Sequence, residues 1–340
     1  MRPSRRILTG VVATAVAVAL SALSAADRPE DAEVPAFLPD TPEIRSDILD
    51  YYAEIEWFAS HLARALKQLG EIGELDNTLV IVTSDNGMAF PRAKANCFEF
   101  GVHVPLAIMW PSRAKGGREV SDPVGFVDLT ATILEAGGVT HPALGQAALA
   151  PVGRSLVSLL ESGKSGRVEP QRTHVFSGRE RHSSSRQNNM TYPQRCLRSD
   201  QYIYIRNFKP DRWPMGNPYN ITADSAPDFK TLENNTFVTY GDLDASPTKA
   251  WLIERRNDEK WEWHYDYAFA KRPREELYVL ADDPDQVNNV AGDENFTAIK
   301  AKLNRQLMGR LKKARDPRVL GDGSTFDKPP YITTQAKRRK

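Results

Sequence analysis

Leu79-Val80-Ile81-Val82-Thr83-Ser84-Asp85-Asn86-Gly87 is the stretch that decides the fold class of this 340-residue chain. Its first five residues form an unbroken apolar run rich in β-branched side chains, which is typical of a strand buried on both faces of a parallel sheet. Polar residues follow directly, and in open α/β sheets ligands bind just beyond the carboxyl ends of the strands. The stretch therefore predicts a buried strand that ends in a ligand-binding loop.

The loop offers the ligands of a hard cation. Asp85 supplies a carboxylate and Asn86 an amide oxygen, which together suit Ca²⁺ or Mg²⁺. An ordinary Asn-Gly turn is the alternative interpretation. Asn-Gly hairpins join antiparallel strands, however, and the next residues, Met88-Ala89-Phe90-Pro91, do not form a return strand. This favours a metal site.

The elements around this stretch predict an α/β fold. Apolar residues at three- and four-residue steps predict an amphipathic helix over residues 42–69. A second buried strand is expected within 102–110, a helix over 126–135 and a short strand over 172–177. Helices that alternate with buried strands are typical of a mostly parallel sheet sandwiched between helices.

The pattern changes after about residue 180. Segments 202–208, 261–267 and 276–280 are alternating or aromatic, which predicts strands of a half-exposed antiparallel sheet. Residues 296–313 predict a final amphipathic helix. Glycine and proline cluster near residues 160–170, where we expect the boundary between the two parts of the chain.

Composition and the amino-terminal residues bear on location and partners. The net charge is +1, from 45 basic and 44 acidic residues, which gives no indication of a nucleic-acid partner. Residues 1–26 resemble a signal peptide with a basic start and an apolar run of small residues, and we expect cleavage before Asp27. The alternative is an uncleaved membrane anchor. We expect export to the periplasm or the extracellular space, no stable membrane span, and a solvated basic tail over 321–340.

The chain has two cysteines, Cys97 and Cys196. Export would permit a disulfide between them. Two free, buried thiols are the alternative, and the sequence leaves both open.

The residues that follow Asp85 resemble a known family. Ser-Asp-Asn-Gly, then Lys94, then an aromatic-Glu-x-Gly step and a Val-Pro pair before a buried strand resemble the sulfatases of the alkaline-phosphatase superfamily. The resemblance is to the heparan N-sulfatase (sulfamidase) branch in particular. It continues through residues 126–134 and 276–284 and covers most of residues 35–315. It implies part of an alkaline-phosphatase-like sulfatase fold, with 27–165 as the C-terminal half of the catalytic domain and 166–320 as an α+β subdomain.

The resemblance also implies an activity and a set of site residues. Such enzymes are sulfuric ester hydrolases that cleave O- or N-linked sulfate from sugars through a formylglycine hydrate and a divalent cation, usually Ca²⁺. Asp85 and Asn86 match one pair of metal ligands. Lys94 matches a cation that contacts the sulfate and stabilises charge in the transition state. His182 matches a histidine that contacts the substrate.

The sequence departs from the family pattern at the nucleophile. Formylglycine is made from Cys or Ser in a Cys/Ser-x-Pro-Ser-Arg motif, and no Cys or Ser of this chain has that context. The near match Met1-Arg2-Pro3-Ser4-Arg5 begins with Met, and we attribute it to chance. We therefore expect a truncated or split gene product, a partner that supplies the N-terminal half, or a non-catalytic remnant that binds sulfated carbohydrate or serves a structural role.

Overall fold

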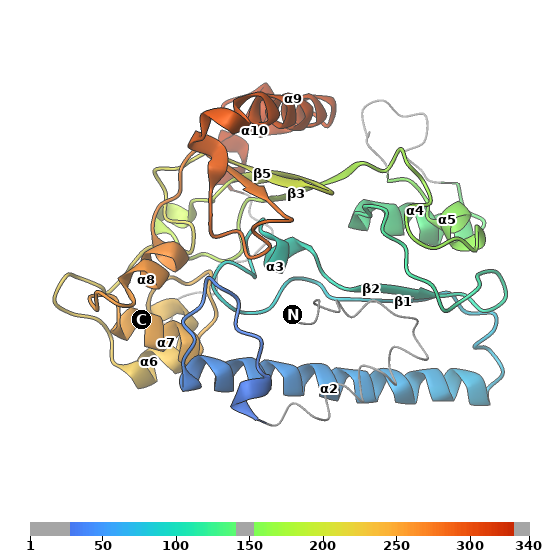
Figure 1. Cartoon of the computed structure of the whole chain (residues 1–340), viewed down its shortest axis with the longest axis horizontal. Helices are drawn as coiled ribbons and strands as arrows, with labels where there is room; N and C mark the ends of the chain where they lie inside the picture. Colours follow the sequence, from blue (N-terminus) through green and yellow to red (C-terminus); the bar gives the residue numbers. More distant parts are fainter. Residues whose placement is uncertain (1–27, 141–152, 330–340) are drawn as a thin grey trace. The chain divides into compact units, whose positions relative to one another are not determined.

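The computed structural model describes residues 28–140 and 153–329. The predicted export signal at 1–26 and the end of the predicted basic tail lie outside these residues. The chain forms two compact units (Figure 1). One contains Arg45–Asp85 and Val104–Thr173 with the residues up to Glu33, and the other contains Val34–Ile44, Asn86–His103 and His174–Lys340. Among the described residues, the helices are all too short or too polar to cross a bilayer.

The first unit contains most of the long amphipathic helix that the sequence predicts. This helix, α2, spans Pro42–Glu71, with the rigid proline ring at its first position. Ile48 is buried, whereas Trp57 and Phe58 further along the helix are 63% and 49% exposed. The other elements of this unit are η1 (Pro29–Asp31), β1 (Val80–Thr83), β2 (Leu106–Met109), α4 (Phe126–Ala136) and α5 (Val157–Glu161).

Strands β1 and β2 correct the prediction of a mostly parallel sheet. They pair in antiparallel register, with Val80 opposite Met109 and Thr83 opposite Leu106. A parallel pair needs a crossover connection, usually a helix, and residues 84–105 contain only the four-residue helix α3 (Glu99–Val102). All residues of both strands are half-buried, so the apolar runs indicated burial without fixing the strand direction. The strand expected within 102–110 is present as β2, which is limited to Leu106–Met109.

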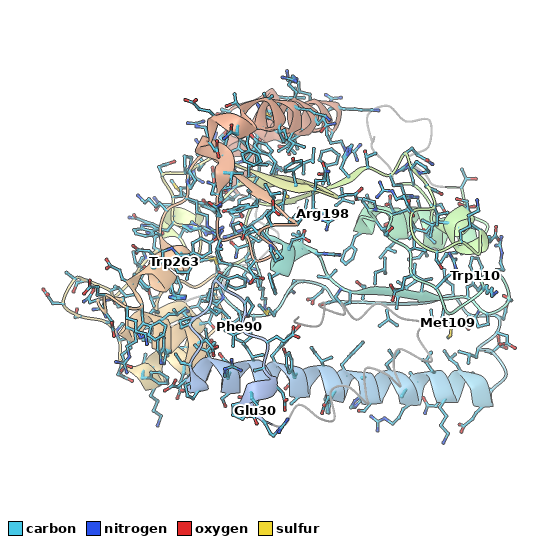
Figure 2. All side chains as sticks on the ribbon, in the orientation of Figure 1. Glu30, Phe90, Met109, Trp110, Arg198 and Trp263 are labelled. Atoms are coloured by element: carbon cyan, nitrogen blue, oxygen red, sulfur yellow. The ribbon has the colours of Figure 1, made fainter. Side chains whose placement is uncertain are left out.

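A separate apolar core stabilises the first unit. Trp110, which follows β2, packs with Leu156 and Leu160 of the α5 region (Figure 2). The buried guanidinium of Arg172 donates a hydrogen bond of 2.9 Å to the Asp128 carboxylate in α4. The ion pair therefore links the last residues of this unit to helix α4.

The second unit is built on a four-stranded antiparallel sheet, as the sequence predicts for the C-terminal part. The strand order is β3-β4-β5-β6. The strands expected at 202–208 and 276–280 are present as β5 and β6, and the strand expected at 172–177 is β3 of this sheet. Their bounds are β3 (His174–Arg179), β4 (Gln194–Ser199), β5 (Tyr202–Asn207) and β6 (Glu275–Val279).

The predicted final helix covers one face of this sheet. It is α9, Thr297–Lys313, and its residues Leu303 and Leu307 pack against Leu197 and Leu277 of the strands (Figure 1). Further helices complete the unit: α6 (Phe229–Asn234), α7 (Pro247–Glu254), α8 (Glu262–Phe269), α10 (Pro317–Leu320), η3 (Gln187–Asn189), η4 (Thr236–Val238), η5 (Val290–Gly292), η6 (Glu294–Phe296) and η7 (Ser324–Asp327).

Helix α8 shows that the strand predicted at 261–267 is wrong. The alternation of aromatic and charged residues there has the period of a strand. Trp261, Tyr265 and Phe269 also stand four residues apart, and this spacing places side chains on one face of a helix. Phe269 is fully buried and its ring lies 5.2 Å from that of Tyr265. The sequence therefore fits both the two-residue period of a strand and the four-residue spacing of a helix. Burial of the aromatic face favours the helix.

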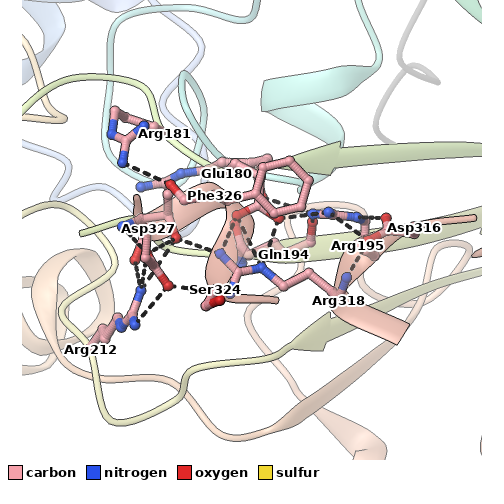
Figure 3. A network of polar contacts seen from close by, with 12 residues as sticks. Glu180, Arg181, Gln194, Arg195, Arg212, Asp316, Arg318, Ser324, Phe326 and Asp327 are labelled. Carbon is pink, nitrogen blue, oxygen red and sulfur yellow. Dashed lines mark hydrogen bonds and ion pairs between the residues drawn. The ribbon is translucent and has the colours of Figure 1, made fainter. Parts of the chain in front are cut away.

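A network of ion pairs fixes the loop that follows β3 (Figure 3). The carboxylate of Glu180 accepts hydrogen bonds of 2.6 Å from both Arg195 and Arg318. Arg195 also donates to Asp316 at 2.7 Å. Because Glu180 precedes His182 by two residues, the network holds the chain where it enters the predicted site.

Candidate functional site

The two predicted metal ligands lie where the two units meet along the sequence. Asp85 is exposed, follows β1 after Ser84, and ends the Arg45–Asp85 segment of the first unit. Asn86 is the first residue of the next segment of the other unit. In the described part of the chain, no three His, Cys, Asp or Glu side chains are grouped to hold a metal ion. Since Ca²⁺ takes six to eight oxygens, these two residues do not by themselves form a complete site.

The loop of residues 86–98 is tightly folded on backbone contacts, and Lys94 lies on it. A Cβ atom on Gly87 would lie only 1.8 Å from the carbonyl oxygen of Phe100. A Cβ atom on Gly101 would lie 2.4 Å from the carbonyl oxygen of Ala93. The backbone N–H of Lys94 donates to the carbonyl of Met88 at 3.0 Å. Only glycine fits these approaches, so the sequence Asp-Asn-Gly serves the shape of the loop as well as its chemistry.

A buried arginine, Arg92, anchors this loop to the aromatic side chains around it. The Arg92 guanidinium is 4% exposed and lies 3.5 Å from the ring centroid of Phe98 and 3.9 Å from that of Tyr267. It donates to the hydroxyl of Tyr278 at 3.1 Å. Arg92 has a φ of 63°, which an arginine adopts only when its surroundings hold it. The loop is therefore a rigid support for Lys94.

Lys94 is paired with a carboxylate that the sequence did not predict. Its Nζ atom lies 2.6 Å from Oδ2 of Asp244, and the two side chains are 24% and 36% exposed. The sequence offers only a local indication of Asp244. The two acidic residues of Asp242-Leu243-Asp244 precede Ser246-Pro247, which is typical of a helix start. Ser246 caps α7 by accepting from the backbone N–H of Lys249.

His182 lies in the loop after β3, and the next residue, Ser183, donates its backbone N–H to the carboxylate of Asp242 at 2.9 Å. Partial desolvation lowers the pKa of His182, the Asp242 carboxylate raises it, and the ammonium of Lys94 lowers it. Asp244 is also near enough to act on the same imidazole. The structure thus places both predicted substrate-contact residues beside the segment 242–244: Lys94 pairs with Asp244, and His182 precedes Ser183, which binds Asp242.

A buried ion cluster lies in the same part of the second unit. It consists of Arg179, Arg186, Asp242 and Lys249. Oδ2 of Asp242 accepts hydrogen bonds of 2.6 Å from both arginines. Burial raises the pKa of Asp242, but the two guanidinium groups lower it more, to about 2. The carboxylate is therefore ionised at any ordinary pH.

Lys249 completes the cluster through backbone carbonyl groups. Its side chain is fully buried, and Nζ donates to the carbonyl oxygens of Thr236 at 3.0 Å and Leu243 at 2.9 Å. Desolvation lowers the pKa of Lys249 to about 8, although Asp244 and Asp242 raise it. These bonds fix the segment 236–244 and, with it, the carboxylate that faces Lys94.

The cysteines do not offer a nucleophile to this site. Both are free and buried in the apolar cluster that contains Phe98, Ile203 and Ile205. Burial raises the pKa of Cys97 to about 11, although nearby guanidinium groups lower it. The pKa of Cys196 is raised well above its ordinary value, mainly by burial. What the site offers is an ammonium, an imidazole and a carboxylate, which suit the binding of an oxyanion with hydroxyl or amine neighbours.

Comparison with known proteins points to the sulfatase family. The family model described as Sulfatase matches residues 22–139, which include Asp85, Asn86 and Lys94. Human N-sulphoglucosamine sulphohydrolase is 31% identical over 295 residues, which are 86% of this chain and 53% of that protein. The chain is thus similar to sulfatases over most of its length. An ulvan-active sulfatase of Formosa agariphila is 23% identical over 298 residues, or 87% of this chain and 43% of the relative.

Solved structures agree on the fold. BT4656 in complex with its substrate D-glucosamine-2-N,6-O-disulfate matches with a TM-score of 0.53 and 20% identity, over 82% of this chain and 42% of that one. BT1596, a 2-O GAG sulfatase, matches with a TM-score of 0.51 and 16% identity, over 93% and 55%. This chain thus has part of an alkaline-phosphatase-like sulfatase fold, and it spans about half the length of these relatives.

Proposed function

We propose that this chain supplies the sulfate-binding side of an enzyme that hydrolyses O- or N-sulfate groups of sugars. The observation that carries the proposal is the Lys94–Asp244 ion pair, on a segment whose Asp242 also accepts hydrogen bonds from Ser183, the neighbour of His182. Similarity to sulfatases supports a sulfuric ester hydrolase. The human relative is named for N-sulphoglucosamine, which favours a glycosaminoglycan-type substrate.

Each of the grouped side chains has a role in this proposal. The ammonium of Lys94 binds a sulfate oxygen and stabilises the negative charge that grows in the transition state. His182, whose pKa is lowered mainly by partial desolvation, contacts the substrate, and its ring N–H can donate a hydrogen bond to the sugar oxygen or nitrogen that carries the sulfate. Asp244 holds the ammonium in position and can accept a hydrogen bond from a sugar hydroxyl once sulfate has bound.

The attacking group and the complete metal site are placed outside this chain. In the family the attack on sulfur comes from a formylglycine hydrate, and no Cys or Ser here has the required motif. We propose that Asp85 and Asn86 contribute two ligands to a Ca²⁺ or Mg²⁺ ion whose other ligands come from a sulfatase N-terminal half. Large exposed apolar side chains of the first unit, such as Trp57, Phe126 and Ile133, support such a partner.

The resemblance of residues 1–26 to a signal peptide supports action in the periplasm or outside the cell. Sulfated polysaccharides outside the cell would be the natural substrates of an exported chain.

Co-expression with a sulfatase N-terminal segment that carries the formylglycine motif tests the proposal. We expect the pair, in the presence of Ca²⁺, to release sulfate from N-sulfoglucosamine or from 4-nitrophenyl sulfate, which neither part does alone. Saccharide binding without turnover in every such pairing would instead support the non-catalytic carbohydrate-binding alternative.

Asp85→Ala is expected to lower the affinity of the assembled protein for Ca²⁺ by about tenfold or more, because one of few charged ligands is lost. Calorimetry and elemental analysis of the purified complex measure this directly. Asp76→Ala is the matched control, since Asp76 is an exposed carboxylate of the same unit. Equal metal content in the Asp85 variant and the control would contradict the assignment.

A further inference from the structure

The second unit contains a cavity of about 330 Å³ that no sequence motif indicated. It is lined by Trp213, Tyr240, Tyr265, Asp266, Ala270 and Lys271. Its volume is within the range of small-molecule sites, which combine apolar walls with a few polar groups. We propose that this cavity binds a second sugar ring of the sulfated saccharide, a neighbour of the unit that loses sulfate. This inference rests on the proposed function.

The walls of the cavity are aromatic and rigid. The ring of Tyr240 lies edge-to-face with those of Trp213 and Tyr265, at 6.4 Å in each case. Tyr240 also stacks on Phe269 at 4.2 Å, and its hydroxyl lies 2.8 Å from that of Tyr265. Because Tyr240 is almost fully buried, it supports the half-buried rings of Trp213 and Tyr265, whose accessible faces are suited to the C–H faces of a sugar ring.

Tyr240 is held in a conformation that costs free energy. Its φ is 42°, a region that non-glycine residues rarely adopt, and its side chain is 2% exposed. Such strain persists where the surrounding structure over-determines the backbone, and it is concentrated at functional sites. The wall is therefore preorganised rather than shaped by a ligand.

The polar groups of the cavity fit a saccharide that carries an anionic group. Asp266 and Lys271 are exposed, and Nζ of Lys271 lies 5.3 Å from the ring centroid of Trp213. The carboxylate of Asp266 can accept hydrogen bonds from hydroxyl groups. The ammonium of Lys271 can bind a sulfate or carboxylate substituent. A purely apolar ligand would make no use of either group.

The cavity and the proposed sulfate site share their support. Arg186 donates to the carbonyl oxygen of Trp213 at 2.7 Å and to the carboxylate of Asp242 at 2.6 Å. Lys249 donates to the carbonyl oxygen of Tyr240 at 3.4 Å as well as to that of Leu243. The buried ion cluster thus fixes both the aromatic wall and the segment that ends at Asp244.

Titration calorimetry of the full chain with a heparin-derived tetrasaccharide and with N-sulfoglucosamine tests the inference. Trp213→Ala is expected to weaken tetrasaccharide binding by about tenfold, since the stacking face is lost, and to leave monosaccharide binding within about twofold. Lys271→Ala is expected to weaken the sulfated tetrasaccharide more than its desulfated form. Trp213→Phe, which keeps an aromatic face, should bind nearly as the original chain does.

Trp263→Ala is the matched control, because Trp263 is 47% exposed on α8 and does not line the cavity (Figure 2). Unchanged tetrasaccharide affinity in both Trp213→Ala and Lys271→Ala, with folding verified by circular dichroism, would overturn the inference. The proposed function fails separately, if Lys94→Ala leaves the binding of N-sulfoglucosamine unchanged.

Discussion

Lys94→Ala is expected to lower sulfate release by the assembled enzyme by about 100- to 1000-fold, the cost of removing one preorganised donor from a developing oxyanion. The side chain itself is surface-accessible and its loop is held by Arg92 and by backbone bonds, so the fold should remain intact. Steady-state kinetics with N-sulfoglucosamine measure the loss in kcat/KM.

Two further variants make this result specific. Lys230→Ala, which removes an exposed lysine of α6, should leave activity unchanged. Lys94→Arg keeps the charge but changes its geometry, and we expect an intermediate rate. If the alanine variant kept the rate of the original chain, Lys94 would have no part in sulfate recognition.

Asp242→Ala is expected to destabilise the second unit by about 3–5 kcal/mol, because it leaves two buried guanidinium groups without their shared carboxylate. Arg179 and Arg186 both donate to this group, and the hydroxyl of Ser183 donates to its other oxygen at 2.7 Å. Urea denaturation followed by tryptophan fluorescence measures the change in the free energy of unfolding.

The pH dependence of the same variant gives an independent check. The pKa of Asp242 is lowered to about 2 in the folded chain, so its stabilising effect is present above the unfolded value of about 3.8. It is lost as the pH falls from about 3.8 to about 2. The difference in stability between the original chain and the variant should therefore shrink in that range. A difference that is independent of pH would contradict the ionised, paired state.

Strong periodicity explains which parts of the fold were predictable. Helix α9 and strands β5 and β6 have apolar residues at regular steps that bury one face, and helix α2 was also predictable, although Phe58 on its apolar face is half exposed. The antiparallel pairing of β1 with β2 was not predictable, because a short apolar run indicates burial but not strand direction. Helix α8 carried two periods, and only packing against Tyr240 and neighbouring rings decides between them.

The candidate site was predictable only in part for a similar reason. Lys94 and His182 could be proposed from family resemblance, and the structure places Lys94 against Asp244 and the neighbour of His182 against Asp242. Asp244, which pairs with Lys94 across 150 residues, and the cavity beside Trp213 depend on contacts that no local pattern reports. The tertiary structure brings these groups into place. In the sequence, Asp244 appears only as one of two acidic residues before a helix start.

The composition of the buried ion cluster has a consequence for how a ligand arrives. The chain as a whole is almost neutral, with a net charge of +1. Locally, however, two buried guanidinium groups share the single carboxylate of Asp242, and the ammonium of Lys249 is buried among backbone carbonyl groups, so the ion cluster carries an excess of positive charge. Low-dielectric surroundings screen buried charges less than water does. A polyanion approaching this face is therefore drawn in from a distance, and the encounter becomes faster as the salt concentration falls.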